Sequence, residues 1–143
     1  MIKFVPTIAD DQPQIREWMQ SDPYHFSKLD YSGPDWWLTG AEGSLLSGAI
    51  DDESGPVLYY RFDSESELVR MHTQFGPVMQ VSKIRVVEAV PDAIDTVSVL
   101  FKSQGFKGIV FETTHVPLMC FMGTLGFKPL KSSNDFVLIF EEN

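Results

Sequence analysis

The sequence predicts an α/β (α+β) domain with a mixed, mostly antiparallel sheet of six to seven strands and about four helices. Three strand-like runs follow one another with only short polar links, which favours an antiparallel meander. A long helical periodicity then separates the third run from a further strand, which implies a parallel crossover. With 143 residues, 43% of them hydrophobic, the chain suits one core, so we expect a single domain over residues 1–143.

The N-terminal part predicts a strand followed by a helix. Residues 2–7, IKFVPT, favour a strand, and Pro13 follows acidic residues at a suitable first helical position. One face of this helix carries three apolar side chains, Ile15, Trp18 and Met19. Prolines, glycines and aromatic residues then fill residues 21–40, which predicts a short helix with loops, or a lid.

The meander is predicted from residues 44–75. The runs 44–52 and 56–64 are separated by a short polar link that ends in glycine, which is typical of a hairpin. The third run, residues 67–75, alternates between two faces. One face carries Leu68, Arg70, His72 and Gln74, and the other carries Val69, Met71, Thr73 and Phe75.

A long helix is predicted by apolar residues at spacings of three and four between Ile84 and Phe101. Pro91 conflicts with a straight helix because it lacks a backbone donor and clashes with the preceding turn. The helix therefore either kinks at Pro91 or begins there. Gly105 is placed to end it in a left-handed cap.

The C-terminal part predicts a buried strand at 108–113, a short helix that ends at Gly126, and a closing hairpin formed by residues 127–130 and 134–142. The short helix carries an apolar stripe, Leu118, Phe121, Met122 and Leu125.

Charge and cysteine content exclude several classes of protein. The chain has 11 basic and 20 acidic residues, and its net charge of −9 disfavours a nucleic-acid or anionic-membrane partner and favours a cationic one such as an amine. Cys120 is alone, so no internal disulfide is possible. The three histidines lack zinc-site spacing, and no metal is expected. Without a spanning apolar run or a signal-peptide core, we expect a cytoplasmic protein.

The order of these elements and the segment GFKGIVFETTHVPLMCFMGTLGFKPL, residues 105–130, resemble the Gcn5-related N-acetyltransferase (GNAT) family, most closely from Ser44 to Glu141. The resemblance implies a sheet split between its fourth and fifth strands, with the pantetheine of acetyl-CoA in the opening and the backbone near Thr73 and Phe75 facing the thioester. It further implies direct acetyl transfer from acetyl-CoA, as co-substrate, to an amine on a small molecule or a protein.

The loop after the fourth strand departs from the family pattern. Placing Pro77 on the family's proline aligns residues 80–85, QVSKIR, with the family's Q/R-x-x-G-x-G/A, so that Lys83 and Arg85 replace both glycines. The cations then either bind the phosphates directly, or fill the cradle so that CoA no longer binds, or point into solvent. The cofactor-binding residues implied by the resemblance are Thr73, Phe75, Gln80, Val81, Ser82, Lys83, Ile84, Arg85, His115 and Met122.

The resemblance also points to candidate catalytic groups. Met122 occupies the place of a tyrosine that protonates the leaving thiolate in many relatives, and methionine donates no proton. His72 is our first candidate for the general base, because its strand borders the split and histidine titrates near neutrality. Glu112 is a candidate base acting through a water, and Tyr60, or its neighbour Tyr59, a candidate replacement phenol. Each has an alternative interpretation as an ordinary packing or strand-end residue.

Two other functions remain open at this point. One is a catalytically inactive GNAT-fold binding or regulatory protein, for example of phage type, that uses an exposed aromatic surface around Trp36. The other is a structural homodimer in which the terminal strand DFVLIF, residues 135–140, pairs with another copy.

Overall fold

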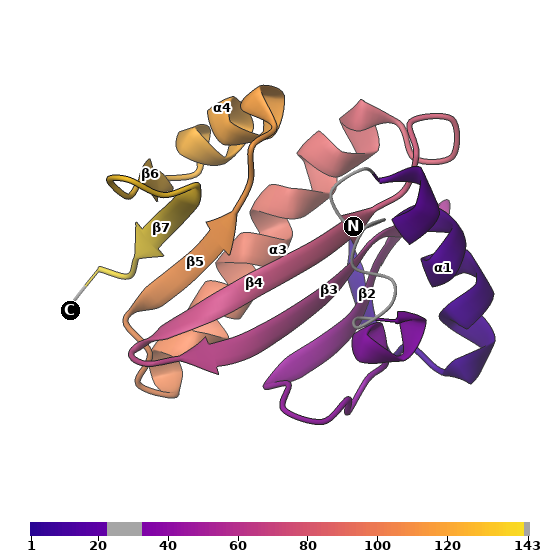
Figure 1. Cartoon of the computed structure of the whole chain (residues 1–143), viewed down its shortest axis with the longest axis horizontal. Coiled ribbons are helices and arrows are strands. Elements are labelled where there is room, and N and C mark those ends of the chain that lie inside the picture. The colour runs from indigo at the N-terminus through magenta and orange to yellow at the C-terminus, as the bar shows by residue number, and fades with distance from the viewer. Residues whose placement is uncertain (23–32, 142–143) are drawn as a thin grey trace.

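A computed structural model describes residues 1–22 and 33–141, which form one seven-stranded sheet with helices on both faces (Figure 1). The strands run in the order β1-β2-β3-β4-β5-β7-β6, and β4 and β5 are the only parallel neighbours within the described part of the chain. The strands are β1 Lys3–Val5, β2 Leu46–Asp52, β3 Gly55–Glu65, β4 Leu68–Phe75, β5 Gly108–Glu112, β6 Lys128–Pro129 and β7 Asp135–Ile139. The predicted mixed, mostly antiparallel sheet is confirmed.

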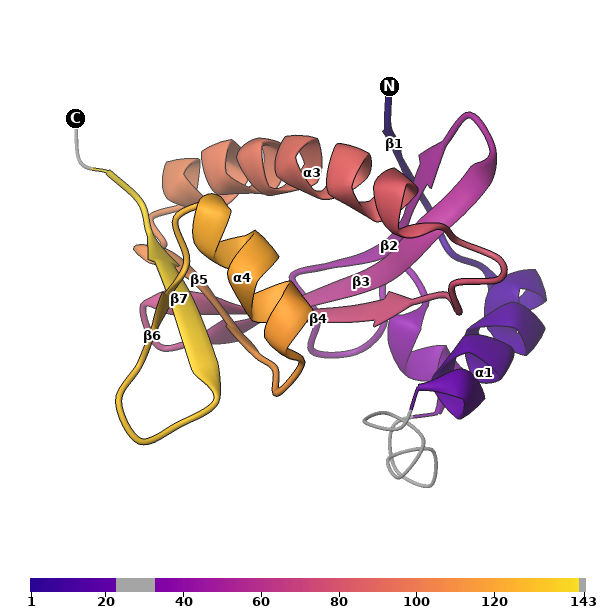
Figure 2. The ribbon, with the colours of Figure 1, turned by 90° about the horizontal axis from the view of Figure 1, so that it is seen from above.

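Within the described residues the helices are α1 Gln12–Ser21, α3 Lys83–Ser103 and α4 Val116–Thr124, with two 3-10 turns, η1 Ala9–Asp11 and η2 Pro34–Trp37. The long helix α3 covers one face of the sheet (Figure 2). There the ring of Phe101 packs against that of Phe62, with centroids 5.1 Å apart. On the other face, the ring of Trp18 in α1 packs against that of Tyr59, with centroids 5.0 Å apart. Residues 23–32 of the expected loop or lid lie outside the described residues.

Helix α3 passes through Pro91 without a break in its helical assignment, so the alternative in which the helix begins at Pro91 is wrong. Proline removes the bond that would be accepted by the carbonyl of Val87, and the Val87 side chain is 49% exposed, on a side where water can reach that carbonyl. The buried stripe, Ala89, Val90, Ala93, Ile94, Val97 and Phe101, continues on both sides of the proline. Gly105, with φ of 94°, ends the helix as predicted.

The sheet is split between β4 and β5, as the family resemblance implies. The two strands pair only at Leu68 with Gly108, Val69 with Ile109 and Arg70 with Val110. Beyond these pairs β4 continues to Phe75 beside β3 alone, while β5 continues beside β7.

The terminal strand β7 lies between β5 and β6. Lys128 and Pro129 of β6 pair with Val137 and Phe136. Pairing of the whole segment 135–140 with another copy is therefore wrong, because β6 already covers part of that edge.

Arg70 holds the two arms of the sheet together at the last pair before the split. Its Nη1 and Nη2 donate to the carboxylate of Asp135 in β7 at 2.9 and 3.0 Å, and its Nε and Nη2 donate to Glu65 at 3.0 and 2.9 Å. The hydrogen bonds from Arg70 lower the pKa of Asp135 below its usual range.

We expect Arg70→Gln to lower the free energy of unfolding by about 1–3 kcal/mol at pH 7. Because the pKa of Asp135 is lowered in the folded state, its contribution is present above the pKa of the unfolded chain, about 3.9, and is lost as the pH falls through the lower folded value. Urea unfolding at pH 7 and pH 3 measures this, with the exposed Arg16→Gln as matched control. An equal loss at both pH values would contradict the role of Asp135.

Candidate functional site

The mouth of the split lies at the C-terminal ends of β4 and β5. Because the two strands are parallel and each is followed by a helix, α3 and α4 both begin at this end (Figure 2). A helix N-terminus carries unsatisfied N–H groups and a partial positive charge, which suits an anion. The mouth therefore combines an opening between strands with two helix ends of the same polarity.

The walls of the split are apolar. A cavity of about 30 Å³ lies between the sheet, α3 and α4. Its lining where β4 and β5 diverge comes from Met71, Thr73, Phe75, Phe111, Leu118 and Met122. Apart from the Thr73 hydroxyl these side chains offer no hydrogen-bonding group beyond a weakly accepting thioether, so the inner part of the split suits an aliphatic chain.

The backbone of β4 presents polar groups to the opening. The amide of Lys107 donates to the carbonyl of Glu67 at 2.8 Å, so the backbone of residue 67 points toward β5. Backbone direction alternates along a strand, which turns the amides of Thr73 and Phe75 to the same side, beyond the paired residues. The Phe75 carbonyl already accepts a bond from the side chain of Gln74 at 3.0 Å. The predicted exposure of the Thr73 and Phe75 backbone to the split is consistent with this register.

The loop between β4 and α3 is anchored to α1. The indole N–H of Trp18 donates to Oε1 of Gln80 at 2.9 Å, and Nε2 of Gln80 donates to Glu17. Val81 is buried at 3% exposure. The side chains of Gln80 and Val81, both expected to contact the cofactor, thus hold the loop in place.

Arg85 fastens the first turn of α3 to the hairpin between β2 and β3. Its Nε and Nη2 form a bidentate pair with the Asp52 carboxylate, both at 2.8 Å, and Nη2 also donates to the carbonyls of Gly55 and Pro56. The hydrogen bonds that Arg85 donates to the carboxylate lower the pKa of Asp52 below its usual range. The interpretation that Arg85 contacts phosphates stays a prediction, and the pair with Asp52 competes with it.

The other polar groups at the start of α3 make no side-chain hydrogen bond or helical bond to the described residues. Lys83 is exposed and makes no hydrogen bond or ion pair with them. Ser82 is the N-cap residue, but its hydroxyl makes no capping bond. The first helical bonds are donated by Arg85 and Val86 to the Ser82 carbonyl, so the amides of Lys83 and Ile84 lack helical partners. The alternatives in which Lys83 fills the cradle or binds phosphates directly both stay predictions.

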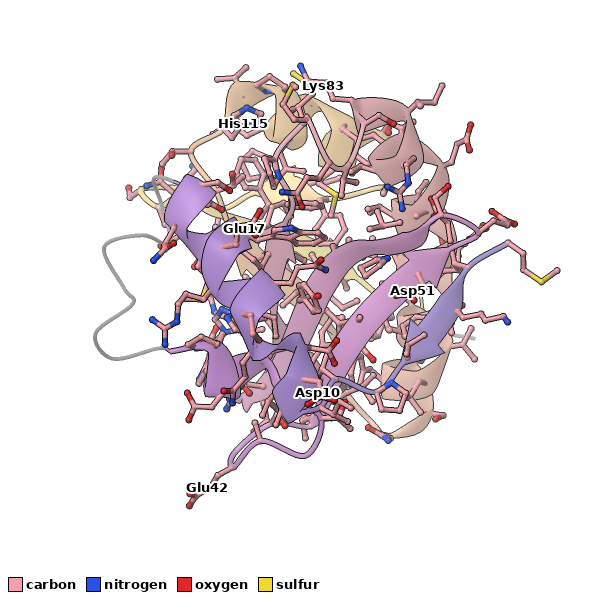
Figure 3. All side chains as sticks on the ribbon, turned by 90° about the vertical axis from the view of Figure 1, so that its right-hand side faces the viewer. Asp10, Glu17, Glu42, Asp51, Lys83 and His115 are labelled. Atoms are coloured by element: carbon pink, nitrogen blue, oxygen red, sulfur yellow. The ribbon has the colours of Figure 1, made fainter. Side chains whose placement is uncertain are left out.

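His115 and Met122 lie on different parts of α4. His115 is the exposed N-cap residue, and Figure 3 shows it at the same end of the molecule as Lys83. Met122 is 2% exposed and lines the cavity, where its thioether cannot donate a proton.

His72 lies on the opposite face of β4 from the cavity. Its Nε2 is 3.5 Å from Oδ2 of Asp63, and Trp36 packs against its ring edge to face, with centroids 4.8 Å apart. Arg61 contacts both of these neighbours of His72. Its guanidinium carbon lies 4.3 Å from the centroid of the Trp36 ring, and its Nε donates to Asp63 Oδ1 at 2.9 Å. The sequence prediction missed Asp63, although the hairpin register that pairs Arg61 with His72 would have indicated it.

The predicted catalytic side chains do not all lie on one face of the sheet. Tyr60 lines the cavity on the α3 face, and burial raises its pKa to about 12. Tyr59 faces α1, where Gln14 Nε2 donates to its hydroxyl at 2.7 Å and burial raises its pKa to about 12 as well. Glu112 is exposed at the end of β5. The expected alternation of Tyr59 and Tyr60 is confirmed, and His72 and Tyr60 lie on opposite faces of the sheet.

Solved structures provide the comparison that decides the fold. No model of a protein family and no curated protein matches the sequence. An acetyltransferase of the GNAT family from Staphylococcus aureus Mu50 aligns with a TM-score of 0.70 and 12% identity, over 99% of this chain and 100% of the other. The chain has the GNAT fold. The PaiA N-acetyltransferase from Thermoplasma acidophilum, solved with coenzyme A, aligns with a TM-score of 0.67 and 13% identity, over 98% and 99% of the two chains.

A third similar structure is a KacTA–DNA complex, which aligns with a TM-score of 0.62 and 14% identity over 97% of this chain and 93% of that one. The expectation of no nucleic-acid partner therefore rests on the net charge of −9 alone. Among the described residues no helix has the length and apolar composition needed to span a membrane.

Proposed function

We propose that this protein is a CoA-dependent N-acyltransferase that moves an acetyl group from acetyl-CoA to an amine. The observation that carries the proposal is the opening beyond the pair of Arg70 and Val110, with the N-termini of α3 and α4 at its mouth. When bound, acetyl-CoA supplies a thioester at which the amine forms a C–N bond while the C–S bond breaks and the thiolate takes up a proton from solvent.

The groups at the mouth suit a diphosphate. The amides of Lys83 and Ile84, the Ser82 hydroxyl and the Lys83 ammonium are donors clustered at the start of a 21-residue helix with no acidic residue in its first turn. Gln80 and Arg85 act indirectly, since they fix the loop and the helix to α1 and to the β2–β3 hairpin. The apolar walls would hold the pantetheine chain, and the amides of Thr73 and Phe75 would orient it.

His72 is proposed to take up the proton that the amine loses, with Asp63 and Trp36 positioning its ring. This assignment puts the acceptor on the face that carries α1 and η2. Figure 3 shows Asp10, Glu17 and Asp51 on the side of the molecule that carries α1. Burial and the nearby Asp11 raise the pKa of Asp51. The excess of acidic residues would attract a cationic amine, on a small molecule or on a protein.

Acetyl-CoA is expected to raise the melting temperature of the protein. At a concentration about 100-fold above Kd a ligand stabilises the folded state by about 2.7 kcal/mol, which corresponds to several degrees for a domain of this size. Scanning fluorimetry with millimolar acetyl-CoA measures the shift. Lys83→Glu should reduce it strongly, while Lys131→Glu, an exposed lysine on the turn after β6, should not. No shift with the wild-type protein would contradict the proposal.

A catalytically inactive binding protein is the second candidate. Gln80 and Arg85 are bonded within the protein, and Met122 stands where a phenol would serve as acid, which favours this alternative. A folded protein that acetyl-CoA does not stabilise, and that releases no thiol in the presence of amines, would support a binding role over transfer.

A further inference from the structure

A groove of about 760 Å³ lies between the C-terminal half of α3 and strand β7, on the part of α3 remote from the mouth. One stripe of α3 forms its first wall, with Pro91, Asp95, Ser98 and Lys102 at helical spacing. Val137 and Ile139 line the second wall. Two apolar side chains at this groove are strongly exposed, Val99 at 73% and Ile139 at 59%. The groove thus contains apolar side chains that the described part of this chain leaves uncovered.

Charges of both signs border this surface. Asp95 and Lys102 lie on α3, while Lys128 and Glu141 lie on the opposite wall. None of the four makes an ion pair with any described residue. Asp95 and Lys102 are seven residues apart, about 10 Å along the helix, and therefore share one side of α3. A partner that matches this wall needs a positive and a negative charge at the same separation but in reversed order.

A second copy of the same stripe of α3, rotated by 180°, presents its two charges in that reversed order. Ser98 and Val99 lie midway between Asp95 and Lys102, and a two-fold axis at this midpoint would place each charge opposite its counterpart. The Oγ of Ser98 is itself buried within the chain and has no hydrogen-bond partner among the described residues. A two-fold interface requires a patch complementary to itself, and these residues provide one.

We propose that a second copy of this chain docks in the groove, with the two α3 helices antiparallel and crossing at Ser98 and Val99. Asp95 then pairs with Lys102 of the partner subunit, Lys102 pairs with the partner's Asp95, and the exposed valines are buried against each other at the axis. Extension of the sheet through β6 is not the route, because that edge is two residues long and contains Pro129.

Sedimentation velocity of the full chain at increasing concentration tests the proposal. The wild-type protein is expected to reach twice the chain mass of 16.2 kDa. Val99→Asp places two carboxylates together at the axis and should give a monomer, whereas the same substitution at Val87, exposed on the mouth half of α3, should leave the dimer intact. Circular dichroism and a thermal melt of each variant establish that it is folded.

A charge exchange tests the antiparallel pairing itself. Lys102→Glu alone and Asp95→Lys alone should each raise the dimer Kd roughly tenfold, because each variant opposes like charges at two symmetric positions. The double variant Asp95→Lys/Lys102→Glu restores opposite signs and should return Kd close to the wild-type value. A wild-type monomer at about 100 μM, near the weak end of specific association, a dimer unaffected by Val99→Asp, or a double variant as weak as the single ones would overturn the proposal.

Discussion

Replacing His72 with glutamine is expected to lower kcat/KM for acetyl transfer to an amine by about 100-fold or more, within the range that general-base catalysis supplies. Glutamine keeps a polar side chain on the α1 face of β4 but cannot accept the proton of the amine. Thiol release from acetyl-CoA, measured against a panel of primary amines, gives the rate.

The pH profile separates catalysis from packing. The wild-type rate should rise with pH as an imidazole loses its proton, and this rise should be absent in His72→Gln. Asp63→Asn is expected to lower the rate less, since Asp63 only positions the ring at 3.5 Å. Because Trp36 packs against His72, a thermal melt must establish that the variants remain folded. An unchanged rate in a folded His72→Gln variant would remove His72 from the mechanism.

Gly108→Ala is expected to lower the free energy of unfolding by roughly 2–3 kcal/mol, as overpacking of a core does. A Cβ atom at Gly108 would lie 2.3 Å from the carbonyl oxygen of Leu138 and 3.2 Å from the Cα of Ile139. Both obstacles are backbone atoms of β7, so relief requires the strand to move. The lost stability would come from weaker packing between β5 and β7, on the far side of the split from β4.

Gly123→Ala is the matched control for this prediction. Gly123 lies in α4, and a Cβ atom there would meet nothing within 4 Å. The same substitution should therefore raise the free energy of unfolding by up to about 0.5–1 kcal/mol, because alanine has a higher helix propensity than glycine. Urea unfolding of both variants measures the two signs. Equal effects would show that close approach of β7 does not explain Gly108.

The sequence was sufficient for most of the fold, because local patterns encode it. Alternation predicted β4, and apolar spacing predicted α3. Pro91 could not be assigned from the sequence, because its cost depends on whether the freed carbonyl of Val87 reaches water, which is a property of the packed helix. The split and the GNAT fold came from the resemblance of residues 105–130 to a family, and the similarity of the whole structure to solved acetyltransferases agrees with it.

The candidate site was less predictable, because contacts between residues distant in sequence determine it. Arg85 pairs with Asp52, 33 positions away, and Gln80 bonds to Trp18, 62 positions away. Nothing in the sequence distinguishes Asp52 from the other aspartates or Trp18 from the other tryptophans, so these contacts could not be predicted. A lysine and an arginine in one loop looked equivalent in sequence, yet only Lys83 is exposed at the mouth without a partner among the described residues.

The position of β5 between β4 and β7 has a consequence for biosynthesis. On the ribosome the β2–β3–β4 meander emerges first and forms through near neighbours, but β5 cannot complete its pairing until β7, which follows it in the chain, has also left the exit tunnel. During that interval the edge of β5 that later pairs with β7 is open, and other nascent chains can pair with it. Slow translation through residues 108–139 should therefore increase aggregation more than slow translation of the first half.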